Sequence, residues 1–132
     1  NGFIMQKGDY RKFHGTIVQI AGIHSIYTDA VGNVLDNSID IAVTDAVLLA
    51  CGFIYDKECS CYELQHNKNR IIIERSRWGG KYCCMICSPK TPPHAPDTIN
   101  HIVTLTDLQD FVRICTSEEL PINVTELANA IK

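Results

Sequence analysis

Residues 104–120 read TLTDLQDFVRICTSEEL, and this stretch decides the fold of the chain. Its apolar residues recur at the three- and four-residue spacing of one helix face, at Leu108, Phe111, Val112 and Cys115. Thr106 followed by Gln109 matches a capping box, and Asp107 places a negative charge in the positive first turn. The pattern predicts a long helix that covers a hydrophobic core and stops before Pro121.

The other face of this helix is polar. It carries Asp107, Asp110 and Arg113. We interpret these side chains, and the pair Glu118 and Glu119, as solvated surface and cap charges, because nothing in their spacing is typical of a catalytic group.

Runs rich in β-branched and aromatic residues precede the helix. They predict short strands at 13–20, 23–28 and 34–41, and then a meander of hairpins at 53–55, 61–65, 71–75 and 82–87, with an edge strand at 99–103. Between the two β regions, Thr44 is a good N-cap and Gly52 a good helix stop, so a short helix is predicted there. Asn123 caps a last predicted helix at 123–131.

The predicted architecture is α+β. One domain of residues 1–132 holds a β-rich part (1–43), the short central helix (44–52), the meander with its Pro-rich loop at 88–97 (53–103) and the helical C-terminal part (104–132). We expect a curled antiparallel sheet, with a partial barrel as the alternative, packed by the long C-terminal helix and the short central one.

Composition and charge restrict the function. The 132 residues are 45% hydrophobic and 20% charged, with a formal net charge of -3. Basic residues cluster only at 68–70 and 75–77, which argues against general nucleic-acid binding. The sequence has no run of about 18 apolar residues that would span a membrane. It also shows no signal-peptide pattern, so we expect a cytoplasmic protein with reduced thiols.

The cysteines are the sharpest chemical candidate. Cys59, Cys61, Cys84 and Cys87 offer a C-x-C and a C-x-x-C pair that together match the four thiolates of a zinc site. The alternative is that these residues are small hydrophobic side chains on adjacent strands. A catalytic cysteine paired with His66, His94 or His101 has no local signature, and no other enzyme motif is present, so we expect no enzymatic activity.

A second candidate is the segment at 75–82. Its residues Arg75, Arg77, Trp78, Lys81 and Tyr82 combine positive charge with aromatic rings, which is typical of partner anchors and of surfaces that stack on a base. The alternative is a hairpin whose Trp78 folds back over the sheet.

Three stretches resemble a known family. Residues 41–53, IAVTDAVLLACGF, resemble the family element PIPLTEEILLKCGF, and residues 106–120 resemble its closing helix HELQNLYYALTGEEL. Residues 8–10, GDY, match a GNY near the family's start. The family consists of small uncharacterised phage and prophage proteins of gut bacteria. Thr106 and Ser117 replace its His and Gly, its two prolines near Ile41 are absent, and residues after 122 extend beyond it.

The resemblance implies a small protein acting in the cytoplasm of a bacterial host, and it brings no activity or catalytic residue. We expect a non-enzymatic module that binds a protein partner or forms a homo-oligomer. One alternative is a counter-defence protein that sequesters a nucleotide signal through residues 75–82 or blocks an immune effector. Another is a zinc-stabilised binding module.

The zinc hypothesis has a direct test. If the four cysteines bind zinc, the purified protein will contain one equivalent of metal, and a strong chelator will lower its melting temperature because metal binding contributes to folding. Metal-free protein with unchanged melting after chelation would contradict it.

Overall fold

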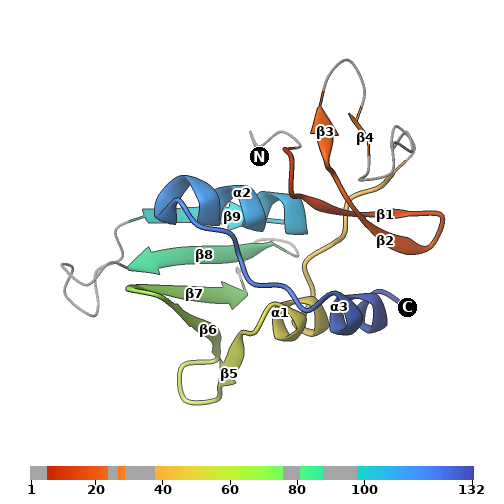
Figure 1. Cartoon of the computed structure of the whole chain (residues 1–132). Coiled ribbons are helices and arrows are strands. Elements are labelled where there is room, and N and C mark those ends of the chain that lie inside the picture. Colours follow the sequence, from red (N-terminus) through yellow and green to blue (C-terminus); the bar gives the residue numbers. More distant parts are fainter. Residues whose placement is uncertain (1–5, 24–26, 29–37, 76–80, 88–97) are drawn as a thin grey trace.

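The computed structural model describes residues 6–23, 27–28, 38–75, 81–87 and 98–132 (Figure 1). The described part contains three helices and nine strands in the following order. They are β1 (Tyr10–Phe13), β2 (Thr16–Gln19), β3 (Gly22–Ile23), β4 (Tyr27–Thr28), α1 (Asp45–Ala50), β5 (Ile54–Asp56), β6 (Cys61–His66), β7 (Asn69–Arg75), β8 (Tyr82–Cys87), β9 (Thr98–Ile102), α2 (Leu105–Thr116) and α3 (Val124–Ala130).

The main sheet is an antiparallel meander. Its five strands are ordered β5-β6-β7-β8-β9, so each strand pairs with its neighbours in sequence. The α+β prediction and the meander are confirmed. The sheet is not closed into a barrel, because β5 and β9 are its edges among the described residues. The predicted Pro-rich loop at 88–97 lies outside those residues.

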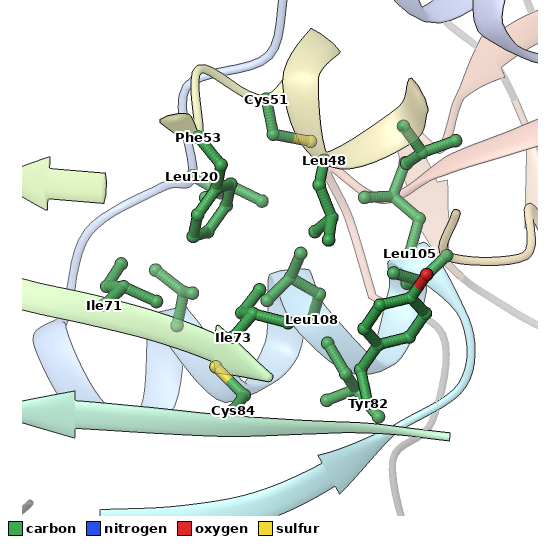
Figure 2. Packing of buried hydrophobic residues seen from close by; sticks show 14 of the residues in the cluster. Leu48, Cys51, Phe53, Ile71, Ile73, Tyr82, Cys84, Leu105, Leu108 and Leu120 are labelled. Atoms are coloured by element: carbon green, nitrogen blue, oxygen red, sulfur yellow. The ribbon is translucent and has the colours of Figure 1, made fainter. Parts of the chain in front are cut away.

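The core lies between one face of this sheet and the helices (Figure 2). Side chains alternate along a strand, so Ile71 and Ile73 of β7 and Cys84 of β8 point to the same face. Leu105 and Leu108 of α2 pack onto them, with α1 closing the cluster from a second side. The predicted apolar stripe of the long helix is confirmed at Leu108, Phe111 and Val112, which are all buried.

Helix α2 lies where the sequence predicts it, but a different residue pair caps it. The N-cap is Thr104, whose side chain accepts a hydrogen bond from the Asp107 backbone N–H, and the Asp107 carboxylate accepts one from the N–H of Thr104 in return. The predicted box of Thr106 and Gln109 is therefore wrong. Thr104 and Thr106 each have a possible hydrogen-bond acceptor three residues later. The structure uses the first of these two pairs, Thr104 with Asp107.

The N-terminal β region is also divided differently. The predicted strand at 13–20 is the end of one strand and the whole of another, because His14 and Gly15 both have positive φ and form a two-residue turn. The predicted strand at 23–28 is also not a single strand, because Ile23 of β3 pairs with Tyr27 of β4 in an antiparallel register. Residues 24–26 lie outside the described part of the chain. Residues 34–37 of the predicted strand at 34–41 also lie outside the described residues, although Ile39 forms an isolated bridge with Lys12.

The central helix forms as predicted. The Thr44 side chain accepts from the Val47 N–H at 3.2 Å, and Gly52 follows the helix with φ of +90°. Helix α3 begins at the Asn123 cap, and the Asn123 N–H donates to the Ala50 carbonyl at 3.0 Å, which fixes α3 beside α1 (Figure 1).

Gly52 gives a test of this helix stop. Gly52→Ala should destabilise the protein by about 1 to 2 kcal/mol, because a Cβ is strained in the left-handed region. The nearest atom to an added Cβ is Leu64 Cδ1 at 3.6 Å, so space is not the limiting factor. Gly52→Asn is the matched variant and should cost less, since Asn tolerates this conformation. Urea unfolding measures both, and equal stability of wild type and the Ala variant would contradict the assignment.

Candidate functional site

The structure places the four candidate zinc ligands on different parts of the main sheet. Cys84 and Cys61 pair with consecutive residues of β7, so their side chains project from opposite faces, and Cys84 is fully buried in the core. Cys87 shares the face of Cys61 but pairs with β7 four residues away. Cys59 is exposed in the turn before β6. Strand geometry therefore separates the two cysteine pairs.

Within the described ranges, no group of three or more His, Cys, Asp or Glu side chains is arranged to hold a metal ion. Burial raises the pKa of the Cys84 thiol, and burial followed by the charge of Cys59 raises the pKa of Cys61 to about 11. A metal would have to displace protons that these thiols hold firmly. Zinc binding thus stays a prediction, without support from this arrangement.

The predicted binding segment is only partly described. Arg77 and Trp78 lie outside the described residues, so neither interpretation of Trp78 is tested. Lys81 is exposed. Arg75 and Tyr82 pair in register where β7 and β8 meet, and the guanidinium carbon of Arg75 lies 5.8 Å from the centre of the Tyr82 ring.

Both of these residues contact Asp45, the first residue of α1. The Tyr82 hydroxyl donates to Asp45 Oδ1 at 2.9 Å, and Arg75 Nη2 lies 3.3 Å from the same oxygen. The sheet supplies the phenol and the cation, and the helix supplies the carboxylate. Sequence reasoning did not connect residue 45 with residues 75 and 82, because the contact depends on how α1 packs against the sheet.

These residues form one wall of a pocket of about 420 Å³, which we call the tyrosine pocket. Its lining residues are Asp45, Tyr55, Ser60, Tyr62, Arg75 and Tyr82. Tyr55 and Tyr62 are register partners on β5 and β6, with ring centres 5.0 Å apart at an interplanar angle of 56°. The sequence contains a signal for this contact, because a tyrosine on each side of a predicted hairpin turn places two rings opposite each other.

A second pocket lies at the same strand. It has a volume of about 490 Å³ and is lined by Ile54, Tyr55, Asp56, Lys57, Glu58, Glu63 and Gln65. We call it the acidic pocket, since it holds carboxylates at Asp56, Glu58 and Glu63 against one lysine. Tyr55 lines both pockets, so strand β5 runs between them.

The electrostatic environment of this region is negative. Burial and then the nearby Asp45 carboxylate raise the pKa of Tyr62 and of Tyr82. The charge of Asp56 raises the pKa of the exposed Cys59 thiol. Burial opposes any charge in this region, whereas the Asp45 and Asp56 carboxylates oppose only a further negative charge and attract a cation.

A separate ionic cluster connects the N-terminal hairpin to α2. Arg113 Nη1 lies 2.5 Å from Asp9 Oδ1 and 2.6 Å from Asp110 Oδ1, and both carboxyl groups are fully inaccessible to solvent. Arg113 Nε also pairs with Glu119 at 2.6 Å. The interpretation of Asp110 as a solvated surface charge is therefore wrong. Asp110 lies on the polar face of α2, and the segment at Gly8 and Asp9 packs against this face and covers Asp110.

The neighbouring contacts complete this junction. Gln109 accepts a hydrogen bond from the Tyr10 N–H at 2.9 Å and donates to the Gly8 carbonyl at 3.1 Å. Gly8 has φ of +97°, and a Cβ there would lie 2.9 Å from Arg113 Nη2. The segment 8–10, which carried part of the family resemblance, is thus the one that docks on α2. Because its carboxyl groups are closed to solvent, we interpret the cluster as structural and the tyrosine pocket as the candidate site.

The comparisons with known proteins add no identity. No family model, curated protein or solved structure matches the chain. The resemblance to phage and prophage proteins stays a prediction. None of the helices in the described ranges is long and apolar enough to cross a membrane.

The buried carboxyl pair predicts a specific pH dependence. Burial, and then the charge of Asp9, raise the pKa of Asp110 from its ordinary value of 3.8 to about 7. Between about pH 4 and pH 7, Asp110 keeps a proton in the folded protein and loses it in the unfolded chain. The stabilisation from this bound proton is therefore complete below about pH 4 and is lost as the pH rises through 7. Asp110→Asn removes the titrating group and should flatten the curve.

The measurement is urea unfolding of wild type and Asp110→Asn from pH 5 to pH 8. The variant should gain on wild type as pH rises, by at most about 1.4 kcal/mol per pH unit, which corresponds to one proton. Parallel curves for the two proteins would show that Asp110 does not hold this proton.

Proposed function

We propose that this protein is a non-enzymatic binding module that takes an extended segment of a protein partner along strand β5. One observation carries the proposal: among the described residues β5 is an edge of the main sheet with two exposed hydrophobic side chains, and a pocket lies on each side of it. Ile54 is 72% exposed and Tyr55 is 45% exposed.

An edge strand leaves backbone N–H and C=O groups free to pair with another chain. In this mode of recognition the added strand sends alternate side chains to opposite faces of the sheet. Here those side chains meet the tyrosine pocket on one face and the acidic pocket on the other. Since β5 has only three residues, we expect the side chains to supply most of the affinity and the backbone to set the direction.

Charge selects the kind of partner. The two pockets are lined by carboxylates at Asp45, Asp56, Glu58 and Glu63 and by the cations Lys57 and Arg75. Arg70 beside them pairs with Glu63 at 2.9 Å, which leaves an excess of one carboxylate. A second copy of this chain would bring the same acidic surface to the contact, and like charges across an interface are costly. The balance favours a basic partner segment over self-association, and over the anionic nucleotide signal that the sequence also suggested.

The sequence resemblance extends the proposal. In a phage or prophage protein inside a bacterial cell, this partner would belong to the host or to the phage itself, and blocking an immune effector is one role of that type. No catalytic constellation supports an enzymatic alternative within the described residues.

A displayed library of random ten-residue peptides, selected on the immobilised full chain, tests the proposal. We expect enrichment of peptides with Arg or Lys at alternate positions. Ile54→Ser combined with Tyr55→Ser should weaken the selected peptides at least tenfold, because it removes the exposed anchors of the edge. Both residues are exposed, so the melting temperature should change little.

The matched control is Ile114→Ser, which removes a similarly exposed apolar side chain (65%) from α2. It should leave peptide binding unchanged. Failure to enrich any peptide, or equal losses in the β5 double variant and in the control, would overturn the proposal.

A further inference from the structure

We infer that the tyrosine pocket is a binding site for an organic cation, the guanidinium or ammonium group of an incoming side chain, and that Arg75 holds this place in the free protein. The inference deepens the proposed function and rests on it for the source of the cation. The inference specifies the chemical class of the ligand, a cation, which the rings and the carboxylate of the pocket would recognise.

Arg75 already makes the contacts that such a cation would make. Its Nη2 lies 3.3 and 3.4 Å from the two Asp45 oxygens, and its guanidinium carbon lies 5.8 Å from the centre of the Tyr82 ring. These distances are at the long end of hydrogen bonding and of cation–π contact. The Arg75 side chain is 69% exposed, and exposed ion pairs of this kind contribute little to stability. Arg75 can therefore leave at low cost.

The Asp45 carboxylate is oriented and accessible, so it can form a stronger ion pair than the one with Arg75. The Tyr82 hydroxyl donates to it at 2.9 Å and fixes one carboxylate oxygen, while the Asp45 side chain remains 51% exposed. Tyr82 itself is 6% exposed and belongs to the core cluster, so its position is rigid. A cation that reaches this carboxylate finds it oriented and open to solvent.

The rings supply the rest of the site. Tyr55, Tyr62 and Tyr82 all line the pocket, and the face of a tyrosine attracts a cation by about 0.5 to 2 kcal/mol depending on how far it is desolvated. The volume of about 420 Å³ falls within the range of about 300 to 1,000 Å³ that is usual for small-ligand sites. Three rings and one carboxylate around one pocket are the composition that recognises alkylated ammonium and guanidinium groups.

An anion fits this pocket poorly. It would meet the Asp45 carboxylate and the negative faces of the rings, and its only cationic contact among the lining residues would be Arg75. The two ligand classes therefore make opposite predictions for one substitution. Removing the Arg75 charge frees the site for a cation and destroys the site for an anion.

The experiment titrates the full chain with tetramethylammonium, with N-acetyl-arginine amide and with inorganic phosphate, following the ring signals of Tyr55 and Tyr62 by NMR. We expect saturable shifts with both cations at millimolar concentration and none with phosphate. Arg75→Gln should tighten cation binding about fivefold, and Asp45→Asn should weaken it at least tenfold. Lys68→Gln is the matched control, because Lys68 is an exposed cation in the turn after β6 and lines neither pocket, and it should change nothing.

Weaker cation binding in Arg75→Gln, or phosphate binding that depends on Arg75, would overturn the inference. Melting temperatures of all variants show whether a loss reflects unfolding. The outcome also separates the two proposals. If selected peptides bind at β5 but show no preference for Arg or Lys and ignore Asp45→Asn, the cation site fails and the docking edge stands. If the cations bind and no peptide is selected, the cation site stands without the edge.

Discussion

One guanidinium and two buried carboxyl groups hold the N-terminal hairpin on the rest of the molecule. Arg113 contacts Asp9 and Asp110 at a place that water does not reach. Burying two carboxyl groups beside a single cation is costly, and the site reduces that cost by keeping one of them protonated at moderately acid pH. We expect this buried ion pair to favour one arrangement of the hairpin more than it adds to net stability, because separating its members would leave a buried charge unpaired.

Local patterns predicted most of the elements, because they depend on residues close in sequence. The Thr44 cap, the Gly52 stop, the hairpins from β5 to β8 and the apolar stripe of α2 all follow from spacing and turn chemistry over a few positions. Two wrong predictions were still local, namely the capping box at Thr106 and the unbroken strand at 13–20. The environment of Asp110 needed distant information. Asp110 reads as a surface residue on its own helix, and only a segment a hundred residues earlier makes it a buried one.

The candidate site shows the same division. Arg75 and Tyr82 were candidate binding residues in the sequence, and their pairing follows from a predicted hairpin. Their common partner Asp45 belongs to a different local structure, so no spacing rule connects it to them. Tyr55 and Tyr62 were within reach of sequence reasoning, because a short turn between two strands sets them side by side. The pocket combines residues from α1 and from four strands, so it forms only after folding.

The two parts of the fold also differ in when they are able to form. The main sheet is a series of hairpins between sequence neighbours, which close quickly because their loops are short. The N-terminal hairpin docks through contacts between residues 8–10 and 109–113, which close a loop of about a hundred residues. On the ribosome the hairpin is made about a hundred residues before its docking surface on α2. Asp9 is therefore exposed to solvent until α2 has been made, and the docking of α2 converts it into a buried group.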